Sequence, residues 1–224
     1  MKKSGFYIIT LIFTISTVLQ AAEAKYYLEK YNDQMNRIST LSAKMLVSSR
    51  LPGLTLVDQQ GMLRYESPDK VDISGGLKEI IPPEAILINL HHVLMDSAVL
   101  VNPDVSYIAA GVQLDIVFNE GAGRLNWSVT MDTLRWYIRE LDVQDPAGNR
   151  VHVIFRQRAV MDDIWLPRSV EVETIPAEEN KRVPNPRRQQ IPRSDSQSGK
   201  MTVRLSDYKI NDPGIYEFFR KSAE

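Results

Sequence analysis

Alternation of apolar and polar residues dominates the chain after residue 110 and predicts a series of β-strands. Five segments place apolar side chains on one face and polar side chains on the other, a period of two. Such alternation is typical of antiparallel sheets with one wet face, because strands of buried parallel sheets read as continuous apolar runs. The inward sets are Val112, Leu114, Ile116 and Phe118; Leu125, Trp127, Val129 and Met131; Leu134, Trp136 and Ile138; Val151, Val153 and Phe155; and Met201, Val203 and Leu205.

Shorter strands are predicted before residue 74. Leu41–Ser48 alternates in the same way, and Leu54–Val57 forms a strand that ends in a turn at Asp58–Gly61. Met62–Ser67 and Lys70–Ile73 follow as the next two strands. We therefore expect one long antiparallel meander with its apolar face turned inward.

Two segments have helical spacing instead, at Lys25–Ser39 and from Pro82 to about Asp96. A proline in the first turn of the second helix suits a helix N-terminus. Their apolar stripes are Tyr27, Leu28, Tyr31, Met35 and Ile38, and Ile86, Leu87, Leu90, Val93 and Leu94. The sequence thus predicts an α+β fold, in which a strongly curved antiparallel sheet, an open half-barrel, covers an N-terminal helix and a mid-chain lid helix.

The apolar strand faces outnumber the helices available to cover them. This architecture leaves room for an apolar cavity rather than a solid core. The residues expected to line such a cavity are Leu114, Ile116, Trp127, Val129, Trp136 and Ile138 on the strands, with Leu87, Leu90 and Leu94 on the lid helix.

The N-terminus has the order of an export signal. A basic start at Met1–Lys3 precedes an apolar run at Phe6–Leu19 and an A-x-A site at Ala22–Ala24. The apolar run has 14 residues, whereas a membrane span needs roughly 20. We expect residues 1–24 to be a signal peptide cleaved after Ala24, leaving residues 25–224 as a single exported domain that is not an integral membrane protein.

Composition narrows the function further. The chain has no cysteine, which excludes a lipid anchor on cysteine, disulfides and thiolate metal sites. Removing Lys2, Lys3 and Glu23 with the signal peptide leaves 25 basic and 27 acidic residues, a net charge of about −2. Such a protein has no global electrostatic attraction to nucleic acid or anionic membranes. We expect a monomer that does not bind nucleic acid.

The segment Pro176–Gly199 differs from the rest in being rich in proline, serine and basic residues. It predicts a disordered or extended loop between two strands. Two interpretations remain open: a solvated loop, or a docking arm for an acidic partner or anionic headgroups.

Catalytic motifs are missing from the sequence. It contains no P-loop, Rossmann fingerprint, G-x-S-x-G or H-E-x-x-H motif, and no nucleophile–base set for a hydrolase is visible. The pair His91–His92 precedes Asp96 at helical spacing, but adjacent histidines point about 100° apart on a helix. The carboxylate pairs Asp162–Asp163 and Glu171/Glu173 suit turn and solvent positions. We expect no enzyme activity, metal or cofactor.

Three stretches resemble a known family. Gly61–Val71 is similar to its hairpin, Asp145–Phe155 to its D-x-x-G-N turn and strand, and Leu166–Val172 followed by Met201–Asn211 to its late strands. Their order and spacing resemble the LolA-like periplasmic lipoprotein carriers and the related lipoprotein-sorting proteins. Ser67 stands where the best-known carriers have an arginine that ties down the lid.

The resemblance implies an unclosed barrel with a helical lid and an apolar cavity that shields acyl chains, without catalysis. The expected function is a carrier for acyl chains of lipoproteins or lipids in transit to the outer membrane, with transfer partners at the inner and outer membranes. The alternative is a periplasmic sensor or scaffold module that binds a protein partner, with the Pro176–Gly199 loop as its docking element.

Overall fold

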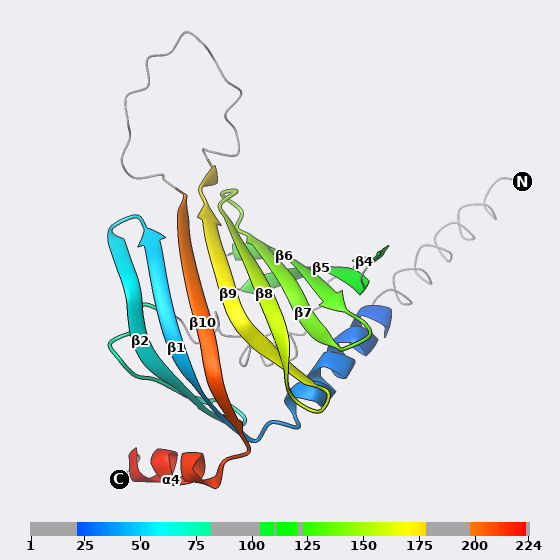
Figure 1. Ribbon diagram of the computed structural model, residues 1–224. Helices are drawn as coiled ribbons and strands as arrows, with labels where there is room; N and C mark the ends of the chain where they lie inside the picture. The colour runs from blue at the N-terminus through cyan, green and yellow to red at the C-terminus, as the bar shows by residue number, and fades with distance from the viewer. Residues whose placement is uncertain (1–21, 82–103, 110, 121–122, 178–197, 223–224) are drawn as a thin grey trace, which may run out of the picture.

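The computed structural model describes residues 22–81, 104–109, 111–120, 123–177 and 198–222. These residues form a large antiparallel sheet and two helices, which confirms an α+β fold with an unclosed sheet (Figure 1). One helix covers residues 22–35. The other elements are β1 (Thr40–Leu51), β2 (Leu54–Glu66), β3 (Lys70–Ile73), β4 (Asp104–Ile108), β5 (Gly111–Glu120), β6 (Gly123–Asp132), β7 (Tyr137–Gln144), β8 (Arg150–Met161), β9 (Ile164–Ile175), β10 (Gly199–Ile210) and α4 (Pro213–Ser222).

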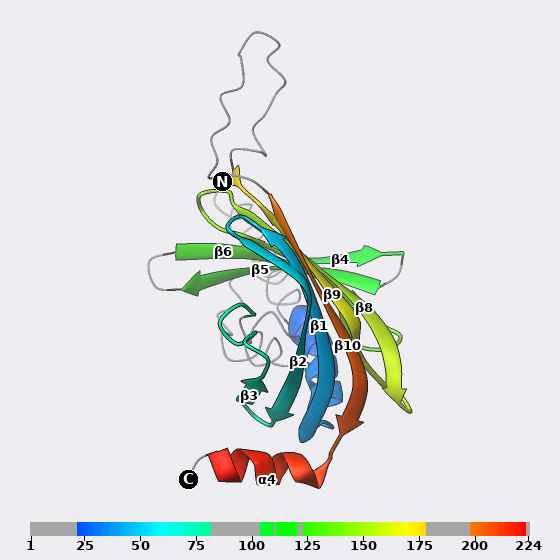
Figure 2. The same cartoon turned by 60° about the vertical axis from the view of Figure 1, so that its left-hand side comes forward.

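The strand order is β3-β2-β1-β10-β9-β8-β7-β6-β5-β4, and every pair is antiparallel. The predicted meander is therefore correct from β4 to β10. The first three strands continue the sheet beyond the last one, because β1 pairs with β10. The chain leaves the sheet at one edge, β3, and re-enters at the other edge, β4. Figure 2 shows how strongly the sheet twists, since β5 and β6 run across the direction of β1 and β10.

The core lies on the inner face of this twisted sheet. Buried apolar residues from the strands form one cluster with those of the N-terminal helix, including Leu28, Tyr31 and Met35. Of the apolar stripe predicted for Lys25–Ser39, Leu28, Tyr31, Met35 and Ile38 are buried and Tyr27 is half-buried, while the helix itself ends at residue 35. An ion pair of 2.7 Å between Arg37 and Asp163 links the end of the helix to the β8–β9 turn.

The predicted turn at Asp58–Gly61 is wrong, because β2 runs through it without a break. The pairing shifts between Val47 and Ser49, which leaves two residues of β2 opposite Ser48. Asp58 has a φ of 47°, and its carboxylate accepts a hydrogen bond of 2.8 Å from the Ser48 hydroxyl. The turn-like sequence therefore forms a β-bulge, which accommodates one extra residue without ending the strand.

The strand predicted through Leu134 and Trp136 is also wrong. Residues 133–136 form a turn, and β7 begins only at Tyr137. The carboxylate of Asp132 accepts a hydrogen bond of 3.0 Å from the Leu134 amide, and the Trp136 amide donates to the Asp132 carbonyl at 2.9 Å. An aspartate that hydrogen-bonds to the amides after it favours a turn, so Leu134 is 88% exposed and only Ile138 keeps its inward position.

Two described elements, β4 and α4, had no counterpart in the sequence prediction. The lid helix at Pro82–Asp96 lies outside the described residues, as do residues 178–197 of the Pro176–Gly199 loop and residues 1–21 of the signal peptide. Ala24, at the expected cleavage site, is buried in the core cluster as part of the helix over residues 22–35. Within the described part of the chain, neither helix has the length and apolar character needed to span a bilayer.

Candidate functional site

The register of the central strands separates the sheet into two chemically different faces. Cross-strand partners lie on the same face, and moving one residue along each strand changes the face. The outer row across β5 to β8 is Asp115, Ser128, Asp142 and His152; the inner row beside it is Leu114, Val129, Leu141 and Val153.

The inner face brings together five of the residues predicted to line a cavity. Leu114, Ile116, Val129 and Ile138 are each at most 1% exposed and belong to the core cluster. Trp127 is half-buried, packs against this cluster and pairs with Ile116 across β5 and β6. These side chains form an apolar surface over β5, β6 and β7.

Trp136 lies elsewhere, because it belongs to the turn before β7. Its ring centroid is 6.1 Å from that of Tyr26 and 6.4 Å from that of Tyr27, so it packs on the N-terminal helix. The lid residues Leu87, Leu90 and Leu94 lie outside the described residues.

Buried tyrosines stay neutral beneath the inner face. Burial, reinforced by the nearby Tyr65, raises the pKa of Tyr31 far above its usual range. The Tyr65 hydroxyl donates a hydrogen bond of 3.2 Å to the carbonyl of Pro68. These two side chains therefore add no charge to the inner face at physiological pH, which is what an apolar ligand requires.

The outer face contains a hollow of about 540 Å³ that the sequence analysis did not anticipate. It crosses β4 to β8, and its lining combines polar side chains with the apolar residues Ile116, Val117 and Trp127. Its side chains include three carboxylates, three amides, one hydroxyl and one guanidinium: Asp104, Asp115 and Asp142; Gln113, Asn126 and Gln144; Ser128; and Arg150.

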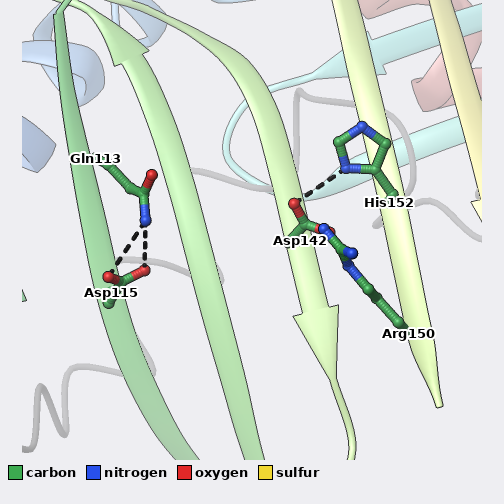
Figure 3. Close-up of polar contacts among 5 residues, drawn as sticks. All are labelled: Gln113, Asp115, Asp142, Arg150 and His152. Carbon is green, nitrogen blue, oxygen red and sulfur yellow. Dashed lines mark hydrogen bonds and ion pairs between the residues drawn. The ribbon is translucent and has the colours of Figure 1, made fainter. Parts of the chain in front are cut away.

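The polar groups of the hollow hold one another in place, as Figure 3 shows. Arg150 donates its Nε–H to Asp142 Oδ1 at 2.5 Å, and His152 Nδ1 lies 3.0 Å from Asp142 Oδ2. Burial alone would raise the pKa of Asp142, but the hydrogen bond from Arg150 and the nearby His152 together lower it below its usual range. Gln113 donates to both carboxylate oxygens of Asp115, at 3.2 and 3.3 Å.

Within each strand, these polar residues follow the alternation expected of an ordinary solvent face. Nothing in the sequence shows that Asp115, Ser128 and Asp142 are cross-strand neighbours, because the register depends on pairing between separate segments. The alternation predicts only which polar residues face outward within each strand.

Comparisons with known proteins add little to this description. No family model matches the chain, and no curated protein matches it in sequence. Among solved structures, it is similar to a DUF1329 family protein from Desulfovibrio piger, with 12% identity, a TM-score of 0.49, and coverage of 89% of this chain and 98% of that one. A domain from Vibrio parahaemolyticus, provisionally described as an outer membrane lipoprotein-sorting protein domain, has 9% identity, a TM-score of 0.44, and coverage of 88% and 97%. Both TM-scores are below 0.5, so the fold is described from its own strand pairing.

The scaffold alternative depends on the Pro176–Gly199 loop. Because residues 178–197 lie outside the described residues, a docking role for this loop stays a prediction from sequence.

Proposed function

We propose that this protein is a periplasmic carrier of acyl chains, belonging to lipoproteins or lipids, and that it has no catalytic activity. The observation that supports the proposal is the apolar inner face of a sheet whose two edge strands, β3 and β4, do not pair with each other. A sheet closed into a small barrel fills its interior with its own side chains. An unclosed, twisted sheet instead offers its apolar face to other elements and to a ligand.

Apolar burial is sufficient to hold such a ligand. Burying a methylene group contributes about 0.8 kcal/mol, so a chain of about a dozen methylenes gains roughly 10 kcal/mol before the costs of binding. Leu114, Ile116 and Val129 present the required apolar surface. Because these residues are buried in the free protein, we infer that the ligand enters when a covering element moves; the predicted Pro82–Asp96 helix is the element we assign to this role.

The predicted signal peptide supports a carrier that works outside the cytoplasm. A chain without cysteine has no site for the lipid that tethers a lipoprotein. The mature protein would then diffuse between membranes, as a shuttle must.

Two tryptophans on opposite faces of the sheet make the proposal testable. By the alternation of β6, Trp127 belongs to the inner face, where it pairs with Ile116, and it also borders the outer hollow. Trp165 lies in sequence between the buried residues Ile164 and Leu166, so by strand alternation it faces outward. Its ring stacks on Tyr137 and lies under the guanidinium group of Arg135. Brominated fatty acids quench tryptophan fluorescence only at short range.

Titration with a brominated fatty acid should quench the wild-type protein and the control Trp165→Phe variant. Quenching should fall in Trp127→Phe, and protein purified gently from its native host should carry lipid in native mass spectrometry. Absence of both quenching and bound lipid in the wild-type protein would exclude the carrier function. Quenching that disappears with Trp165 rather than Trp127 would place the ligand away from the Ile116–Trp127 surface and contradict the proposal.

A further inference from the structure

The hollow lies on the outer face of the sheet, whereas the apolar core cluster lies on the inner face; Ile116 and Trp127 border both. Asp115, Ser128 and Asp142 lie along its length as successive cross-strand partners. Ser128 has the smallest side chain of the three, so the hollow has the most space at the middle of this row. The volume of about 540 Å³ falls within the roughly 300–1,000 Å³ of small-molecule sites.

The hollow is already organised for hydrogen bonding. Asp142 is held from two sides by Arg150 and His152. The bond to Asp142 uses the Nε–H of Arg150, and the guanidinium group has four more N–H groups on its two Nη atoms. The Arg150 side chain is 44% exposed, so solvent and ligands have access to it. Groups that neighbours already hold lose less freedom when a ligand binds.

The other end of the hollow supplies acceptors. Asp115 accepts two hydrogen bonds from Gln113, but a carboxylate has about four lone-pair positions. Asp104 is its cross-strand partner, directly opposite on β4. Like charges in this arrangement repel each other, and hydrogen-bond donors placed between them relieve that repulsion.

This combination of groups selects a ligand by exclusion. An anion would meet three carboxylates, and a wholly apolar molecule would leave the polar groups without partners, while Ile116, Val117 and Trp127 give the lining an apolar part. The carboxylates outnumber the guanidinium group, so a cation is the rival ligand that the test must distinguish. A hydroxyl group both donates and accepts, so adjacent hydroxyls can bond to carboxylates and to amide or guanidinium N–H groups at once. No three of the His, Asp and Glu side chains in the described part of the chain are grouped so that they could hold a metal ion. We propose that the outer hollow binds a neutral oligosaccharide.

The test begins with the whole mature protein on an array of neutral bacterial oligosaccharides, with spermidine as a separate cationic probe in solution. Bound sugars are then titrated into 15N-labelled protein and followed by NMR. Ser128→Trp should abolish binding by filling the middle of the hollow. Thr202→Trp, on the same outer face of β10, is the matched control and should bind like the wild type.

Asp115→Asn tests the chemistry without changing the shape. It replaces charge-assisted hydrogen bonds with neutral ones, so affinity for the sugar should fall roughly tenfold. Absence of any neutral sugar from the array hits would overturn the proposal. So would binding of spermidine without sugar, which would make the hollow a cation site, or sugar binding that survives Ser128→Trp. The fatty-acid titration uses a different ligand and is scored separately, so failure of sugar binding leaves the test of the carrier function intact.

Discussion

Gly111 offers the sharpest test of the strand arrangement around the outer hollow. It begins β5 and pairs with Ile108, next to the end of the β4–β5 hairpin. Its φ is +146°, and a Cβ at this position would lie closer than 3.0 Å to the carbonyl group of Met131 and 3.3 Å from the Cα of Asp132. These are backbone atoms of β6, so no change of side-chain rotamer can relieve the contact.

We expect Gly111→Ala to lower the free energy of unfolding by roughly 2–6 kcal/mol. About 1–3 kcal/mol comes from the backbone conformation and a similar amount from the forced displacement of β6. Gly53→Ala is the matched control, because Gly53 also has a positive φ, +76°, but no atom lies within 4 Å of its added Cβ. That control should lose only about 1–2 kcal/mol.

Urea unfolding, followed by tryptophan fluorescence and circular dichroism, measures both losses on the same scale. The difference between the two variants isolates the contact with β6. Equal losses would show that Gly111 does not lie against the Met131 carbonyl, and the β4–β5–β6 register that shapes the hollow would then be wrong.

Three further predictions follow from individual side chains. Ile138→Ala should destabilise the protein by about 2–5 kcal/mol in urea unfolding, because Ile138 is fully buried in the core; a loss below that range would mean that its site is not packed. Asp132→Ala should cost about 1–2 kcal/mol by removing the acceptor for the Leu134 amide, whereas Asp132→Asn, which keeps an acceptor, should cost less; equal losses would contradict the role of the carboxylate in the turn. The pKa of Asp142 is lowered in the folded state, so its contribution to stability is present at neutral pH and is lost as the pH falls through that lowered pKa. The urea midpoint of the wild type should therefore fall more between neutral and acidic pH than that of Asp142→Asn, and parallel pH profiles would refute this assignment.

Much of the fold was predictable from local pattern. The alternation of Leu114 and Ile116 with polar residues assigned a face to each side chain of β5, and the structure buries the apolar set. The same reasoning failed at Leu134 and Trp136, where the apolar and polar residues alternate as in a strand although residues 133–136 form a turn. The nearby Asp132 carboxylate accepts hydrogen bonds that a strand partner would otherwise accept. The hydrophobic period alone does not show that the turn is favoured over a continued strand.

The sequence by itself determined which side chains share a face within a strand, the absence of cysteine chemistry and the apolar character of the proposed carrier surface. Only the tertiary structure decided that β1 pairs with β10 and that Asp115, Ser128 and Asp142 line one hollow. The reason is that side-chain direction follows from the local backbone, with a period of two in any strand. The choice of a strand's partner and register depends instead on which distant segments together bury the most apolar surface, and no single segment carries that information.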